Sequence, residues 1–259
     1  MPIDISSPES SPLRKDRSMP NTPSHDFKLV RFQVVLMVEP IGKDGAKIYR
    51  ALLDDVLATF DASPTILPRP DGAPFDFPML IMNSVNQEWQ ANIAFERIDL
   101  VYQPIGEAID PNYYDNLVLT LLNVISALEF GIKVKRMAGV LTRYKLQNSA
   151  SRYLSQQYCQ EWMTKTEPEV QRGPLARPQH FELHAHKSYE KLGFKINSWI
   201  RNKTASSASA QDNALLIEQD INIVDFPGTY FDQKSVKVFF EVVKNEFDEI
   251  INLYHGNRK

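Results

Sequence analysis

Residues 217–256 read IEQDINIVDFPGTYFDQKSVKVFFEVVKNEFDEIINLYHG: a strand-like run, a short link, a long apolar helix and a glycine. Residues 93–131 read IAFERIDLVYQPIGEAIDPNYYDNLVLTLLNVISALEFG and follow the same plan. Upstream, residues 27–40 and 134–147 each supply a strand that precedes a helix. An order of elements that recurs along a chain predicts that the chain folds as repeated structural units.

The recurrence predicts an α+β fold of two pseudo-equivalent β-α-β-β-α halves. We place the first unit at residues 27–131 and the second at residues 132–259. Each half is expected to be an antiparallel sheet with helices packed on one face. Residues 1–26 are mostly Ser, Pro and charged residues, and too few are apolar to offset the entropy of ordering, so a disordered tail is expected.

Hydrophobic spacing places the individual elements. In the first half we expect a strand at 27–40, a helix through Ile48 and Phe60, strands at 79–85 and 89–103, and a helix at 111–130 with Asp110 as N-cap and Gly131 as C-cap. In the second half we expect strands at 132–147, 180–186, 193–201 and 214–224, a helix at 149–163, a flexible loop at 204–211, and a helix at 233–254 with Asp232 as N-cap.

Composition describes a globular chain with no recognisable catalytic motif. The 259 residues are 43% hydrophobic and include one cysteine, Cys159, which excludes an intrachain disulfide. No signal-peptide core or run of about 18 apolar residues occurs, so we expect a cytoplasmic protein with no membrane partner. Glycine-rich phosphate loops, Gly-x-Ser-x-Gly, paired Cys ligands and His-Glu-x-x-His are all missing. We therefore assign no catalytic residue, expect no cofactor and favour a non-enzymatic role.

The middle of the chain is basic. Residues 131–203 carry 14 Lys/Arg against 5 Asp/Glu, a net +9, whereas residues 27–130 carry 7 against 14, a net −7. In nucleic-acid-binding proteins, basic side chains contact phosphates and aromatic side chains stack on exposed bases. The candidate nucleic-acid or partner-binding residues are Lys133, Lys135, Arg143, Lys145, Arg152, Tyr153 and Trp162. The first four share one parity of a predicted strand, and the alternative is that they contact an acidic protein surface.

Histidines and a glutamate alternate along another predicted strand. His180, Glu182, His184 and His186 would share one face, because strand side chains repeat every two residues. Imidazole and carboxylate groups are ligands for zinc and similar metals, so this is a candidate metal site. The alternative is the solvent-facing side of an amphipathic strand. An ion pair between Asp99 and Arg136 is a further candidate contact.

A resemblance to a known family rests on short motifs. The strands RIDLVY at residues 97–102 and RMAGVLTRY at residues 136–144, with the long apolar helix between them, resemble a sporadically distributed family of uncharacterised bacterial α+β proteins. The resemblance implies an α+β fold and a link to mobile or defence-related loci, and it transfers no catalytic residues.

These observations favour a non-catalytic binding or adaptor subunit of an intracellular bacterial assembly, with a role in antiviral defence as a further expectation. Its partner is expected to be another protein, with an acidic surface, and a second copy of the chain is an alternative. The competing functions are a nucleic-acid-binding accessory protein that uses residues 133–177, and a metal-dependent enzyme at residues 180–186.

Overall fold

The computed structural model describes residues 26–42, 44–52, 56, 58–106, 108–128, 132–159, 180–207, 210–224 and 228–256. In chain order the elements are β1 (Lys28–Val38), α1 (Gly45–Leu52), β2 (Thr65–Ile66), β3 (Pro78–Asn83), β4 (Trp89–Ala94), β5 (Arg97–Tyr102), α2 (Tyr113–Ala127), β6 (Val134–Leu146), α3 (Ala150–Tyr158), β7 (Glu182–Lys191), β8 (Phe194–Ser207), β9 (Ala210–Ile223) and α5 (Gln233–His255). The tail predicted at residues 1–26, apart from Asp26, lies outside this description.

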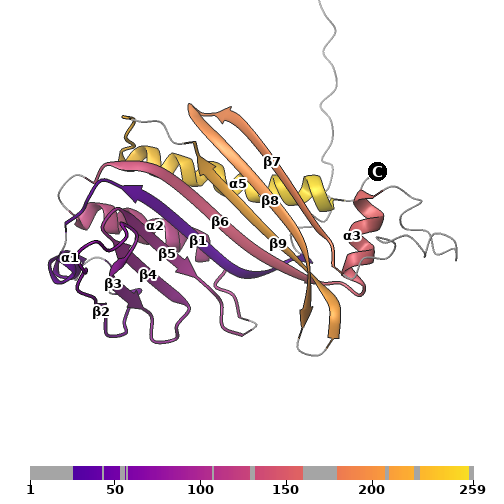
Figure 1. The fold of residues 1–259 in the computed structure, drawn as a ribbon, viewed down its shortest axis with the longest axis horizontal. Helices are drawn as coiled ribbons and strands as arrows, with labels where there is room; N and C mark the ends of the chain where they lie inside the picture. The colour runs from indigo at the N-terminus through magenta and orange to yellow at the C-terminus, as the bar shows by residue number, and fades with distance from the viewer. Residues whose placement is uncertain are drawn as a thin grey trace, which may run out of the picture.

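The strands form one antiparallel sheet in the order β2-β3-β4-β5-β1-β6-β9-β8-β7 (Figure 1). The α+β class is therefore confirmed, but the expectation of a separate sheet in each half is wrong. The sheets merge because β1 pairs with β6 along almost its whole length, from Lys28 opposite Tyr144 to Val38 opposite Val134.

The two sides of this central pairing have similar strand orders. From the centre outward, β1 is followed by β5, β4 and β3, and β6 is followed by β9, β8 and β7. On each side, three consecutive strands form an antiparallel meander. The last strand of the meander, β5 or β9, pairs with the central strand, β1 or β6. The short strand β2 extends the first side by one further pairing.

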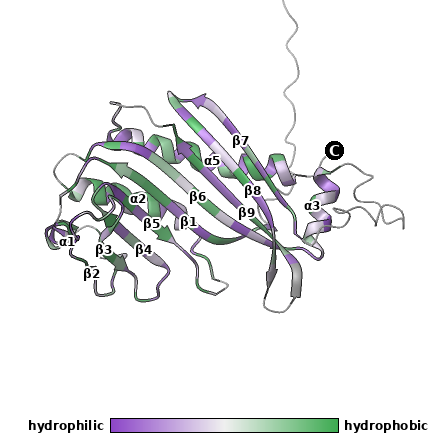
Figure 2. Ribbon diagram, in the orientation of Figure 1, coloured by the Kyte–Doolittle hydropathy of each residue, from purple (hydrophilic) through white to green (hydrophobic). Residues whose placement is uncertain are grey.

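Helices cover one face of the sheet, and the main hydrophobic core lies between the sheet and these helices. Phe32, Val34 and Leu36 of β1 are completely buried on this face, against Leu121 of α2 and Val243 of α5. In Figure 1, α2 and α5 lie on the same side of the sheet. Figure 2 shows hydrophobic residues concentrated in the central strands and in α2, whereas the edge strand β7 is largely hydrophilic. None of the described helices is long and apolar enough to cross a membrane.

The predicted strand at 89–103 is instead a hairpin. The chain turns at Phe95 and Glu96, so that Ile93 of β4 pairs with Ile98 of β5. The turn carries neither Gly nor Pro, so the sequence gives no local signal for it. Tertiary contacts hold it, because the amide of Glu96 donates to the carbonyl of Phe75, and its carbonyl accepts from the amide of Val38.

The helix predicted from residue 111 begins at Tyr113. The Asp110 side chain accepts from the amide of Asn112 at 2.8 Å and from Nδ2 of Asn116 at 2.9 Å, so it closes a turn ahead of the helix and does not serve as its N-cap. The end predicted at Gly131 is outside the described residues.

At the second long helix the N-cap prediction is confirmed. Asp232 precedes α5, and its carboxylate accepts from the amide of Ser235 at 2.8 Å. The flexible loop predicted at 204–211 is wrong, because β8 and β9 continue through most of it. Thr204 pairs with Leu215 and Ser207 with Ala210 in a long hairpin, and backbone pairing outweighs the low strand preference of the Ser- and Ala-rich sequence.

Candidate binding surface on the open face of the sheet

The face of the sheet opposite the helices is covered by no described helix, and we call it the open face. Two rows of side chains cross it from β5 to β7, because each strand register sets the neighbours of the next. The first row is Asp99, Val35, Ala138, Asn222, Asn197 and Ser188. The second row is Val101, Gln33, Val140, Asp220, Trp199 and His186.

Side-chain hydrogen bonds tie the outer part of these rows together. Ser188 Oγ donates to Asn197 Oδ1 at 2.6 Å, and Asn222 Nδ2 donates to Asp220 Oδ1 at 2.9 Å. The imidazole of His186 stacks on the indole of Trp199, with ring centroids 4.0 Å apart. This part of the open face is therefore pre-organised, with its side chains held by one another.

A second hydrogen-bonded group lies on the other side of the centre. Arg97 donates from Nε to Asp99 Oδ2 at 2.6 Å, and Gln33 Nε2 donates to Asp99 Oδ1 at 2.7 Å. The hydrogen bond to Asp99 raises the pKa of the Arg97 guanidinium, although partial burial opposes it. The ion pair expected between Asp99 and Arg136 is absent, because Val35 of β1 lies between their strands and Arg97 occupies the carboxylate.

Between the two groups the surface is hollowed by a cavity of about 230 Å³. We call it the hollow, and it lies where β1 pairs with β6. Its lining is Gln33, Val35, Met37, Arg97, Arg136, Met137, Ala138, Val140, Asp220 and Asn222. Ala138 is the small residue at its centre, flanked by the branched side chains of Val35 and Val140 in the two rows.

The hollow thus combines apolar side chains with charged and amide groups. Arg136 donates a hydrogen bond from Nη2 to Asn222 Oδ1 at 2.9 Å. Among the described residues it has no carboxylate partner. Its guanidinium has five donors, so most of its hydrogen-bonding capacity remains for a ligand. The arrangement suits an apolar group in the hollow with a hydrogen-bond acceptor beside it.

The basic residues in and just before β6 do not gather into one patch. A β-bulge between Val134 and Arg136 changes the alternation of the strand, so Lys133 lies on the opposite face from Arg143 and Lys145. The strand rise puts Lys133 and Lys145 about 40 Å apart. The prediction that these side chains share one face of the strand is therefore wrong, because the bulge shifts the alternation.

Three of these cations already have acidic partners. Lys133 Nζ lies 3.4 Å from Glu39, and Lys145 Nζ lies 2.8 Å from Asp26. Arg143 lies between the sheet and α5, where its side chain is 13% exposed and its Nη1 is 3.1 Å from Asp248. The carboxylates of these contacts offset the positive charge that the sequence predicted to be available for a partner.

The remaining residues of the predicted basic surface are scattered. Lys135 is half-buried at the bulge of β6. Arg152 is exposed on α3, while Tyr153 packs against a small cluster around Leu154 and Ile251. Trp162 is outside the described residues.

The alternation predicted for residues 180–186 is confirmed, although the strand starts at Glu182. Glu182, His184 and His186 are exposed, and the residues between them are half-buried. His180 is exposed just ahead of the strand. His184 Nε2 lies 3.2 Å from Glu182, but no group of three or more His, Cys, Asp or Glu in the described chain is arranged to hold a metal ion.

The hollow and its rim were not predicted. Their residues come from β1, β5, β6 and β9, and only the strand register brings them together. The alternation of polar residues in RIDLVY and RMAGVLTRY was the one local signal that these strands have an exposed side. Comparison with known proteins adds no assignment, since no protein-family model and no curated protein matches the chain.

Proposed function

We propose that this chain is a non-catalytic binding or adaptor subunit that holds a partner protein on the open face of its sheet. The hollow carries this proposal. Its volume of about 230 Å³ is below the roughly 300 to 1,000 Å³ of small-molecule sites, and it suits a single side chain better. Met37 and Arg136 line it, and Trp199 lies in the row that crosses it, all residue types enriched at protein interfaces.

The partner is proposed to present an apolar side chain beside a carboxylate. The apolar group would enter between Val35, Ala138 and Val140. The carboxylate would accept the unused donors of Arg136, which fits a partner with an acidic surface. The setting we propose, an intracellular bacterial assembly linked to defence, rests on the family resemblance alone.

Nucleic acid is the weaker alternative. Polyanion binding needs several cations that release counterions together, and Lys133, Arg143 and Lys145 are spread over both faces and paired with carboxylates. On the open face, Arg97 and Arg201 are also paired, with Asp99 and Glu218.

We also propose that the chain consists of two pseudo-equivalent units, residues 27–131 and 132–259. The matching strand order on either side of the β1–β6 pairing supports this relationship. Antiparallel pairing of corresponding strands is the arrangement that a two-fold relationship between the units requires. The hollow would then lie on the pseudo-symmetry axis.

Co-purification from the native cell with a matched pair of variants tests the binding role. Ala138→Trp fills the hollow, and Ala205→Trp puts the same side chain on β8, where residue 205 pairs with Ala214 near the far end of the sheet. We expect one stoichiometric protein to accompany the wild type and the Ala205→Trp variant and to be lost from Ala138→Trp. Retention of that protein by Ala138→Trp, with an unchanged melting temperature, would refute the role of the hollow.

A further inference from the structure

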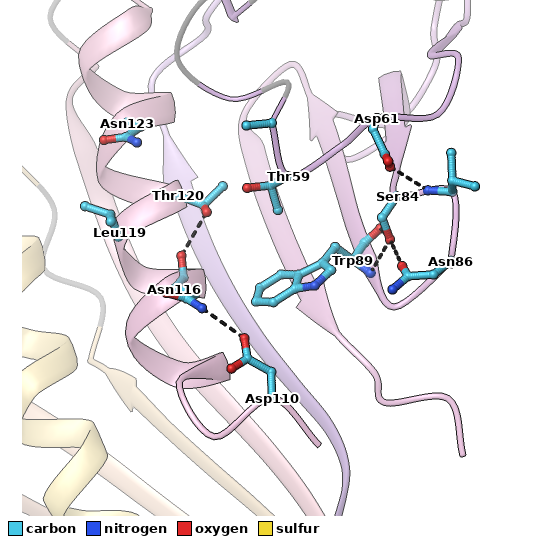
Figure 3. Close-up of a pocket in the computed structure, with 12 residues that line it drawn as sticks. Thr59, Asp61, Ser84, Asn86, Trp89, Asp110, Asn116, Leu119, Thr120 and Asn123 are labelled. Carbon is cyan, nitrogen blue, oxygen red and sulfur yellow. Dashed lines mark hydrogen bonds between the residues drawn. The ribbon is translucent and has the colours of Figure 1, made fainter. Parts of the chain in front are cut away.

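A second and larger cavity, of about 690 Å³, lies on the helix-covered side of the molecule (Figure 3). We call it the α2 cleft, because α2 forms one wall and the turn between β3 and β4 forms the other. Its lining is Ala58, Thr59, Asp61, Ser84, Val85, Asn86, Trp89, Asp110, Asn116, Leu119, Thr120 and Asn123. It is separate from the hollow, with which it shares no lining residue.

An aromatic platform lies in the cleft. The indole of Trp89 projects from β4 toward Asn116 of α2 (Figure 3). It packs against the ring of Tyr102, with centroids 4.6 Å apart, and Tyr102 is completely buried. The phenol of Tyr102 accepts from the amide of Asp110 at 3.0 Å, so the platform has a rigid support.

The charge of the cleft is negative. Asp61 and Asp110 line it, and none of the described lining residues is Lys or Arg. Both carboxylates are held in place: Asp61 Oδ1 accepts from the amide of Val85 at 2.7 Å, and Asp110 accepts from the amide of Asn112. The cleft also belongs to the part of the chain with a net charge of −7, residues 27–130, so it repels anions and attracts cations.

The rims of the cleft are apolar. Leu119 of α2 is 57% exposed on one side and Val85 is 69% exposed on the other. Exposed apolar groups beside a polar, acidic interior match a long side chain with a hydrocarbon stem and a charged end. A cation over the face of an indole gains additional electrostatic attraction.

We propose that the α2 cleft binds an organic cation, an ammonium or guanidinium group, and that this group is the end of a Lys or Arg side chain of a partner protein. The cation would lie on the Trp89 face near Asp61 and Asp110, and its stem would pass between Leu119 and Val85. The site is independent of the proposed role of the hollow, and either can fail without the other.

Titration of the full-length, ¹⁵N-labelled protein, followed at the tryptophan indole N–H signals, tests this proposal. A Trp89→Phe variant assigns the relevant signal among the three tryptophans. We expect Nα-acetyl-lysine amide to shift that signal saturably, and its neutral analogue Nα-acetyl-norleucine amide to bind about tenfold more weakly or not at all. Equal binding of the two probes would overturn the proposal. So would a shift caused by methyl glucoside and not by the lysine probe.

Matched variants separate the charge from the fold. Asp61→Asn keeps an oxygen for the amide of Val85 and removes the charge, so the lysine probe should bind severalfold more weakly while other signals stay in place. Asp71→Asn removes an exposed charge of the same segment that does not line the cleft, and should change nothing. Equal affinity of the Asp61→Asn variant and the wild type would contradict a carboxylate-bound cation.

The source of the cation is distinguished with tetramethylammonium, which has no stem. If the ligand is a Lys or Arg side chain, Leu119→Ser should weaken the lysine probe and leave tetramethylammonium unaffected. Tight binding of tetramethylammonium, together with an unchanged affinity of the Leu119→Ser variant for the lysine probe, would show that the ligand is a free cation and not the side chain of a partner.

Discussion

Arg136 donates a hydrogen bond from Nη2 to Oδ1 of Asn222, 2.9 Å away across the pairing of β6 with β9. Asn222 is only 4% exposed although it lies on the open face, and its own amide donates to Asp220. Asn222→Ala would remove an acceptor and a donor together. We expect it to lower the free energy of unfolding by about 1 to 2 kcal/mol in urea denaturation. Asn245→Ala, on the exposed side of α5, is the control, and an equal effect of the two variants would show that the hydrogen bonds of Asn222 do not stabilise the fold.

Gly139 lets α5 approach the sheet closely. A Cβ at this position would lie 2.8 Å from Cγ1 of Val243 and 3.4 Å from Cζ of Phe247. Both partners are buried side chains of α5, so Gly139→Val should cost about 1 to 3 kcal/mol of stability through overpacking. Ala138→Ser, one residue away on the open face, should be nearly neutral. A Gly139→Val protein with the wild-type melting temperature would show that the α5 contact is looser than described.

Buried His255 should make the protein sensitive to acid. Its Nε2 lies 2.7 Å from Asn202 Oδ1, and burial, assisted by the charge of Lys145, lowers the pKa of its imidazole from 6.5 to about 4. Between those two pH values the unfolded chain binds a proton that the folded chain does not. The stabilisation is therefore complete above pH 6.5 and is lost as pH falls toward 4, by roughly 3 kcal/mol.

Denaturant unfolding at a series of pH values measures this loss. His255→Leu should flatten the profile between pH 6.5 and 4. An identical slope in the wild type and the His255→Leu variant would rule out His255 as the source.

The two proposed units should not unfold independently. The β1–β6 pairing joins them in one sheet, so a separated unit would expose a long central strand edge, which promotes aggregation. We expect one cooperative calorimetric transition for the whole chain, and poor solubility of residues 27–131 expressed alone. A soluble, folded fragment with its own transition would show that the pairing is dispensable.

Local patterns predicted the elements whose signals are local. Asp232 followed by an apolar stripe placed the start of α5, and the alternation of residues 180–186 placed their exposed side. The turn at Phe95 and Glu96 was missed because its stabilising hydrogen bonds come from residues distant in sequence. The length of the β8–β9 hairpin was missed for a related reason, since cross-strand pairing overrode a Ser- and Ala-rich composition.

The binding surface was harder to predict than the fold. A count of cations in residues 131–203 cannot reveal that Arg143 faces Asp248 and that Lys145 faces Asp26, because those pairs join residues about a hundred positions apart. The bulge in β6, which separates Lys133 from Arg143, has no sequence signal either. The hollow depends on the register of four strands, and one residue of slip in any of them would remove it.

Site-specific photocrosslinking in the native cell shows whether a partner protein occupies the hollow. A photoreactive phenylalanine analogue replaces Met37 in the hollow or, as the control, Leu146, which is 65% exposed at the end of β6. We expect one partner protein to crosslink at position 37, to be absent at position 146, and to disappear when Ala138→Trp is added. Crosslinks at position 37 that survive Ala138→Trp, or crosslinks to nucleic acid instead of protein, would contradict this expectation.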